Sequence, residues 1–261
     1  MSDLLKVAAI QLDIKQGDKA GNLAEASRLI NSLPEGYDIA VLPEMFTTGF
    51  ICDRGQSEML AETVDGNSLS EIRRLAAGKK IAVCGSFIAR DGDAVYNRAF
   101  FIEPSGDSYY YDKHHLFSIS GEEKAYSRGG SRIPVFRFRG WNIAMAVCFD
   151  VRFPAWLRNH DGAYDLMIIM ANWPDSRAYA WEHLLIARAI ENQSYVIGCN
   201  RSGNDQYGEY SGTSAIIDAK GRLIGEKSDS PVMTAELSRD SLDTFRKKFP
   251  VLHEADRFSI I

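Results

Sequence analysis

The sequence predicts an α/β fold in one domain of 261 residues, and three observations indicate it. A βαβ unit opens the chain, with a strand over Val7–Ile14, a helix over Gly21–Leu33 and a buried strand over Asp38–Leu42. The turn Asp91–Asp93 then starts a hairpin. Strands and helices alternate again after the polar loop at Gly129–Gly130. Such a mixture predicts large mixed sheets covered by helices, either two sheets back to back or one very wide sheet.

The elements of the first half follow from apolar runs and the residues that interrupt them. The first helix ends before Pro34, because proline lacks the N–H that a helix interior requires. After the second strand we expect a helix and then a three-stranded meander, over Ser68–Ala77, Ile81–Ala89, Ala94–Ile102 and Ser108–Tyr111.

The second half repeats the alternation of strands and helices. We expect strands over Val135–Arg139, Asn142–Val147, Asp165–Ala171, Tyr195–Cys199, Ser214–Asp218, Leu223–Glu226 and Val232–Glu236. Helices are predicted near Ala155–Asn159 and over Tyr179–Gln193. No repeat or Pro/Gly/Ser-rich linker interrupts the chain, so residues 1–261 are predicted to form a single domain.

Composition excludes several classes of protein. Hydrophobic residues make up 45% and charged residues 25%, as in ordinary folded proteins, which argues against disorder and against a disulfide scaffold. The net charge is -5, so there is no excess of positive charge to neutralise a phosphate backbone. Nucleic acid is therefore not an expected partner.

The chain also lacks signals for export or membrane insertion. The first residues carry no basic segment followed by an apolar one, and the longest apolar run, Leu166–Ala171, is far shorter than the ~20 residues that cross a bilayer. The four cysteines lie tens of residues apart without a CxxC pair, so we expect reduced thiols and no metal site. These features predict a cytoplasmic protein.

Three reactive residues stand just beyond predicted strands, where ligands of such sheets bind. Glu44 follows Pro43 at the end of one strand, Cys148 ends another, and Lys113 follows the third strand of the meander. Each residue alone could have a purely structural role. Together they suit acyl transfer, since an ammonium favours a thiolate, a carboxylate takes the proton and the thiolate attacks a carbonyl.

The segments around these residues resemble the nitrilase, or carbon-nitrogen hydrolase, superfamily over nearly the whole chain. The matching motifs are Leu42-Pro43-Glu44-Met45-Phe46, Tyr111-Asp112-Lys113-His114-His115-Leu116-Phe117 and Ala146-Val147-Cys148-Phe149-Asp150-Val151-Arg152-Phe153-Pro154. The resemblance implies a four-layer αββα sandwich. It also implies a catalytic triad in which Glu44 is the general base, Lys113 stabilises the oxyanion and Cys148 is the nucleophile.

Two further groups are assigned on the same resemblance. Glu122 occupies the place of a second glutamate that often follows the lysine motif, which suggests that it orients Lys113 or the attacking water. The backbone N–H of Phe149 is expected to complete the oxyanion site. The implied mechanism passes through a thioester on Cys148 and needs a small amide and water, with no metal and no organic cofactor.

Downstream motifs resemble the omega-amidase branch, whose members hydrolyse 2-oxoglutaramate and related monoamides. They are Arg152-Phe153-Pro154-Ala155-Trp156, Ala171-Asn172-Trp173-Pro174 and Ala187-Arg188-Ala189-Ile190-Glu191-Asn192-Gln193. The pair Phe149-Asp150 replaces the Trp-Glu of true nitrilases and favours an amide over a nitrile.

A substrate of this kind has a free carboxylate, for which arginine is the best-shaped partner. Arg177 and Arg152 are the candidates, although Arg152 could instead pair with Asp150. Phe117 and Trp173 are candidates for apolar walls around the short acyl chain.

Other functions stay open at this level. The chain could be another superfamily amidase or a carbamoyl hydrolase. It could be a Cys-His hydrolase with His114, His115, His160 or His183 as base. A metabolite-binding module without catalysis is a third alternative, against which the intact Glu44, Lys113 and Cys148 argue.

The superfamily resemblance further implies a homodimer or a larger homo-oligomer. The segment 237–261 ends in the apolar run Phe258-Ser259-Ile260-Ile261 and is a candidate intersubunit arm.

Overall fold

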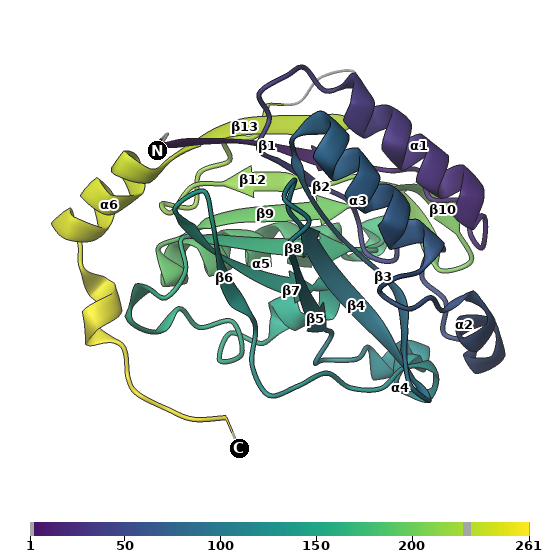
Figure 1. Ribbon diagram of the computed structural model, residues 1–261. Coiled ribbons are helices and arrows are strands. Elements are labelled where there is room, and N and C mark those ends of the chain that lie inside the picture. The colour runs from purple at the N-terminus through teal and green to yellow at the C-terminus, as the bar shows by residue number, and fades with distance from the viewer. Residues whose placement is uncertain (1–2, 227–230, 261) are drawn as a thin grey trace.

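In the computed structural model, which describes residues 3–226 and 231–260, the chain forms two β-sheets packed face to face with helices outside them (Figure 1). The first sheet has the order β13 (Val232–Ser238), β1 (Leu4–Ile10), β2 (Ile39–Val41), β3 (Ala82–Asp91), β4 (Ala94–Ile102) and β5 (Ser108–Asp112). The second has the order β12 (Ala215–Ile217), β9 (Tyr195–Asn200), β8 (Leu166–Ala171), β7 (Trp141–Val147) and β6 (Val135–Phe138). The predicted four-layer αββα sandwich is confirmed, and two sheets rather than one wide sheet are present.

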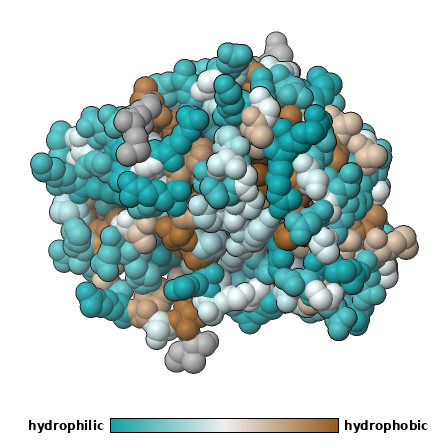
Figure 2. Space-filling view, in the orientation of Figure 1, coloured by the Kyte–Doolittle hydropathy of each residue, from teal (hydrophilic) through white to brown (hydrophobic). Residues whose placement is uncertain are grey.

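Helices cover the outer faces of both sheets. The helices are α1 (Lys19–Ser32), α2 (Arg54–Leu60), α3 (Asn67–Lys79), α4 (Glu122–Ala125), α5 (Ala178–Asn192) and α6 (Arg239–Lys248). Figure 1 shows α1 and α3 side by side along the first sheet, and α5 behind the second. On the face seen in Figure 2 the surface is mostly hydrophilic, with apolar side chains in smaller patches. No helix among the described residues is long and apolar enough to cross a membrane.

Strand alternation divides the apolar residues of the first sheet between two cores. In β1, Val7 and Ala9 belong to the core between the sheets, whereas Ala8 and Ile10 pack with the helices. This alternation follows from the strand period of two, which points successive side chains to opposite faces. Because both faces of the central strands are covered, side chains on both faces are mostly apolar, and the register of the strands is fixed.

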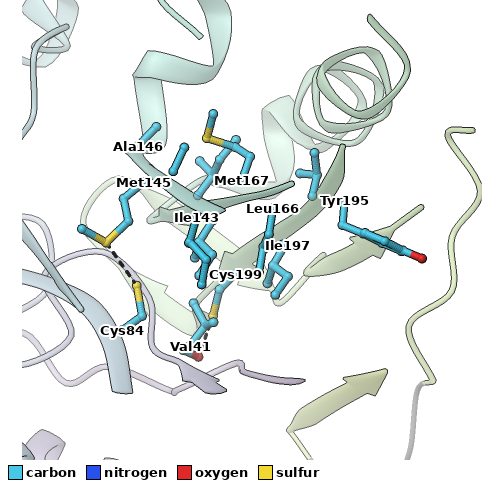
Figure 3. Packing of buried hydrophobic residues seen from close by; sticks show 14 of the residues in the cluster. Val41, Cys84, Ile143, Met145, Ala146, Leu166, Met167, Tyr195, Ile197 and Cys199 are labelled. Atoms are coloured by element: carbon cyan, nitrogen blue, oxygen red, sulfur yellow. Dashed lines mark hydrogen bonds between the residues drawn. The ribbon is translucent and has the colours of Figure 1, made fainter. Parts of the chain in front are cut away.

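The inner faces of the two sheets meet through buried side chains from β2, β3, β7 and β9 (Figure 3). The Cys84 thiol lies 3.7 Å from the Met145 sulfur, and the Cys199 thiol donates to the Val41 carbonyl over 3.2 Å. All four cysteines are free thiols, as predicted. Cys84 and Cys199 therefore serve the packing between the sheets.

Most of the predicted elements are confirmed, but several segments differ. The helix predicted near Ala155–Asn159 is wrong: these residues form turns, because Trp156 and Leu157 are buried after a 3₁₀ turn over Cys148–Arg152. The strand predicted over Leu223–Glu226 is reduced to isolated bridges. The chain also has α2, α6 and a separate hairpin, β10 (Ser202–Asp205) and β11 (Gly208–Ser211), that the periodicity did not indicate.

The C-terminal segment begins inside the sandwich. Leu237 lies near the end of β13 and pairs with Leu5 of β1, and Leu242 of α6 is buried in the core between the sheets. The later residues run along the surface, and Ile261 lies outside the described residues. An intersubunit role for 237–261 stays a prediction.

The close contact between α5 and β9 gives a stability prediction. A Cβ added at Gly198 would lie 2.3 Å from Leu185 Cδ1 and 2.9 Å from Trp181 Cζ2. Gly198→Ala is therefore expected to lower the free energy of unfolding by about 1–3 kcal/mol through overpacking. Urea unfolding would measure this, with Gly78→Ala in α3 as the control, because a Cβ there meets nothing within 4 Å. Equal stability of the two variants would contradict the packing described.

Candidate active site

Loops at one end of the sandwich bring together a buried ammonium and two buried carboxylates. Lys113 Nζ donates to Glu44 Oε1 over 2.9 Å and to both Glu122 oxygens, each over 2.9 Å. Glu44 follows β2, Lys113 follows β5 and Glu122 begins α4. The side chains of all three are at most 1% exposed. A single positive charge thus lies between two acids in a water-excluded site.

Neighbouring donors fix the two carboxylates. Asn97 Nδ2 on β4 donates to Glu44 Oε1 over 2.7 Å and to Glu122 Oε1 over 3.3 Å. The backbone N–H of Asn172 donates to Glu44 Oε2 over 2.8 Å, and that of Phe117 to Glu122 Oε2 over 2.6 Å. Because their oxygens are held by directed hydrogen bonds, both acids have a defined orientation.

Cys148 lies on a sharp turn between β7 and the 3₁₀ turn that it begins. Its φ of 46° is in the left-handed region, which non-glycine residues adopt rarely and which recurs at functional sites. Asp150, fully buried, stabilises this turn by accepting from the Val147 N–H over 3.1 Å and from the His115 N–H over 3.0 Å. Asp150 therefore connects the cysteine turn to the loop that carries Lys113.

Burial and the neighbouring charges shift the pKa values of the cluster. Burial, and then the charge of Glu44, raise the pKa of the Cys148 thiol well above its ordinary value. Burial also raises the pKa of Glu122. Burial alone would lower the pKa of Lys113, but the carboxylates of Glu122 and Glu44 outweigh it and raise that pKa well above its usual value. These shifts favour a neutral thiol and a charged ammonium in the resting site.

Cys148 and Lys113 open onto a cavity of about 850 Å³. Its lining is mainly aromatic and apolar and includes the predicted walls, Phe117 and Trp173, together with Phe149. Such a cavity has room for a small organic substrate.

Both predicted arginines reach this cavity. The Arg152 guanidinium lies 5.0 Å from the Trp173 ring centroid, and that of Arg177 lies 5.3 Å from the Phe117 ring centroid and 6.0 Å from that of Trp173. Within residues 3–226 and 231–260, neither forms an ion pair with an acid. Arg152 does not pair with Asp150, whose oxygens accept instead from Tyr111, Val147 and His115.

The histidines considered as alternative bases do not line the cavity as described. His115 Nδ1 lies 2.8 Å from Asp150 Oδ1, His114 stacks on Trp156, and His183 Nδ1 lies 2.7 Å from the Tyr179 carbonyl oxygen. His160 contacts Phe258 near the C-terminus. The geometry thus favours Glu44 over a histidine as the base for Cys148.

Sequence reasoning missed several residues of the site. Asn97 carries a detectable signal, because it is a polar residue inside the apolar strand Ala94–Ile102. Asn172 follows the end of β8, as Glu44 and Cys148 follow the ends of β2 and β7. Tyr207 and Tyr210, which also line the cavity, gave no signal, because they come from the unexpected hairpin β10–β11. Among the described residues, no group of three or more His, Cys, Asp or Glu is arranged to hold a metal ion.

Comparison with known proteins agrees with this geometry. The model of the carbon-nitrogen hydrolase family matches residues 6–247. "Omega-amidase YafV" of Yersinia enterocolitica is 38% identical over 98% of this chain and 99% of its own length. "2-oxoglutaramate amidase" of Bacillus subtilis is 33% identical over 95% of this chain and 96% of its own.

A solved structure has the same fold along the entire chain. XC1258 from Xanthomonas campestris, described as a CN-hydrolase superfamily protein with an arsenic adduct in the active site, has a TM-score of 0.93 and 35% identity. The match covers 100% of both chains.

Proposed function

Because the chain belongs to the carbon-nitrogen hydrolase family, we propose that it hydrolyses the terminal amide of a small omega-amide such as 2-oxoglutaramate. One observation carries the proposal: Lys113 lies buried between Glu44 and Glu122, in the cavity that Cys148 also lines. The names of the omega-amidase and 2-oxoglutaramate amidase relatives support the choice of substrate. The products are the dicarboxylic 2-oxo acid and ammonia.

The first half of the reaction forms a thioester. Glu44 takes the proton of the Cys148 thiol as the sulfur attacks the amide carbon. The Lys113 ammonium and the Phe149 backbone N–H hold the oxyanion. As the C–N bond breaks, Glu44 passes the proton to the leaving nitrogen, and ammonia departs. Because the pKa of the thiol is raised, proton transfer accompanies the attack.

The second half returns the enzyme to its starting state. Glu44 removes a proton from water, and the hydroxide attacks the thioester carbon. The C–S bond breaks, the acid is released and Cys148 regains its proton. Glu122 keeps Lys113 charged and in place through both halves. Neither half uses a metal ion or an organic cofactor.

Arg177 and Arg152 supply the positive charge for the free carboxylate of the substrate. Arg177→Gln is expected to raise KM for 2-oxoglutaramate by about 10-fold or more, since a hydrogen bond to a charged group contributes ~1.5–3 kcal/mol. Steady-state kinetics would measure it, with an uncharged short amide as the control substrate. Arg152→Gln distinguishes the two arginines, and unchanged KM values in both variants would contradict this assignment.

Ammonia release from a panel of substrates tests the proposed reaction. The panel contains 2-oxoglutaramate, 2-oxosuccinamate, glutamine, asparagine and simple nitriles. We expect release from the two 2-oxo acid amides to exceed that from the amino acids and the nitriles. Preference for a nitrile, or for a carbamoyl compound added to the panel, would replace the omega-amide by another substrate of the family.

We further propose a homodimer or larger assembly in the cytoplasm. Light scattering of the full chain is expected to give at least twice the mass of 29.1 kDa of one chain. A monomer at micromolar concentration would contradict this part of the proposal.

A further inference from the structure

The hairpin β10–β11 forms one wall of the cavity while pairing with neither of the two main sheets. Tyr207 lies in its turn, and Tyr210 is on β11. Tyr207 packs edge-on against Phe50 at 5.5 Å, and the Phe50 ring centroid lies 5.7 Å from Lys113 Nζ. Two tyrosines from one small hairpin therefore line the same cavity as Cys148.

A buried ion pair holds this hairpin. Arg201 Nη1 donates to Asp205 Oδ2 over 2.8 Å, and the side chains of both residues are at most 1% exposed. The other Arg201 nitrogens donate to backbone carbonyls, of Ile14 over 2.6 Å and of Ser202 over 3.1 Å. Its guanidinium carbon lies 4.5 Å from the Tyr210 ring centroid. Arg201 thus joins the hairpin to the segment after β1.

Asp205 connects that pair to both tyrosines. Its Oδ1 accepts from the Tyr207 backbone N–H over 2.8 Å and from the Tyr210 hydroxyl over 3.1 Å. A second connection reaches the loop with Trp173 and Arg177, where Asp175 Oδ1 accepts from the Ser211 N–H and hydroxyl, each over 2.9 Å. Tyr207 and Tyr210, which together we call the tyrosine wall, are therefore both held by hydrogen bonds to Asp205.

A buried ion pair is weak evidence for stability, because apolar residues of similar volume are often as stable or more so. Its directed hydrogen bonds can, however, specify one position of a segment. We propose that Tyr210 and Tyr207 form a specificity-determining wall that limits the length of the acyl chain, and that the Arg201–Asp205 pair positions this wall. The inference rests on the proposed function for its substrates, 2-oxo acid omega-amides.

The wall is tested by enlarging the pocket. Tyr210→Ala is expected to shift the ratio of kcat/KM between a six-carbon and a five-carbon 2-oxo acid omega-amide by about 10-fold or more toward the longer substrate, the range that one methylene gives in a pocket. Tyr210→Phe keeps the ring but loses the hydrogen bond to Asp205, so we expect a smaller shift in the same direction. An unchanged ratio in both variants would overturn the proposal that Tyr210 limits the length of the acyl chain.

The positioning role is tested with a matched pair of buried acids. Asp205→Asn is expected to shift the same ratio by at least about 3-fold, because a wall that is no longer held fits the two chain lengths differently. The control is Asp165→Asn, since Asp165 is also buried and paired with arginines, Arg239 and Arg246, but does not line the cavity. A ratio does not change with the fraction of folded enzyme. Equal ratios in the wild type and Asp205→Asn would overturn the positioning role.

A second readout keeps this inference separate from the proposed substrate. Alkylation of Cys148 by iodoacetamide and by the larger N-phenyliodoacetamide, followed by peptide mass spectrometry, needs no amidase activity. The measured quantity is the ratio of Cys148 alkylation by the larger reagent to alkylation by the smaller one. We expect this ratio to be higher in Tyr210→Ala and Asp205→Asn than in the wild type and in Asp165→Asn. If the wild type hydrolyses no omega-amide, the proposed function fails and this selectivity still decides the inference; unchanged selectivity would contradict it.

Discussion

Replacing Cys148 by alanine is expected to lower kcat/KM for 2-oxoglutaramate by about 10³-fold or more, since the change removes the thiol that forms the acyl intermediate. The fold should persist, because Cys148 makes a small contribution to a large core. Ammonia release measures the loss, and thermal unfolding verifies the fold.

A matched thiol provides the control for this variant. Cys84→Ala removes another buried thiol, which packs against Met145 between the sheets. It is expected to lose some stability but to retain the wild-type kcat. Activity of Cys148→Ala above a few per cent of the wild type would exclude Cys148 as the nucleophile.

Replacing Lys113 by methionine is expected to affect stability and activity together. The change leaves Glu44 and Glu122 buried without their ammonium, and breaking a buried ion pair by removing one partner costs about 3–5 kcal/mol. The loss of an oxyanion donor should also lower kcat by about 10²-fold or more. Urea unfolding and steady-state kinetics measure the two effects.

A double variant separates these two effects. Lys113→Met with Glu122→Gln removes one of the two unpaired charges, so we expect it to regain part of the lost stability while staying inactive. Loss of less than about 1 kcal/mol of the free energy of unfolding in the single variant would be well below the cost of a broken buried pair. Such a result would contradict the role of Lys113 in stabilising the two buried carboxylates.

The predictable parts of the molecule are those specified by local pattern. Apolar runs ended by polar residues located the strands before Glu44, Lys113 and Cys148, because strand ends determine where such residues gather. The packing of two sheets against each other, by contrast, is determined by contacts between segments that are far apart in the sequence, such as that of Cys199 with Val41. Periodicity does not contain that information.

The unexpected elements depend on contacts between segments that are far apart in the sequence. The sequence of β10 is Ser-Gly-Asn-Asp, which lacks an alternation of apolar and polar residues. The strand is held in place by Arg201, which donates a hydrogen bond to the carbonyl of Ile14, far earlier in the chain. α6 has a mostly charged sequence and is held by Leu242 in the core. The helix expected near Ala155–Asn159 failed because the burial of Trp156 and Leu157 outweighed helix propensity.

Hydrolysis of glutaramate in the presence of hydroxylamine tests the central claim most directly, because this small omega-amide lacks the 2-oxo group that hydroxylamine would convert to an oxime. If a thioester forms on Cys148, hydroxylamine will intercept it, and the wild type will release ammonia while forming the hydroxamate at the expense of the free acid. Ammonia release without hydroxamate at high hydroxylamine concentration would contradict the covalent mechanism. The absence of both products would contradict the proposed substrate class.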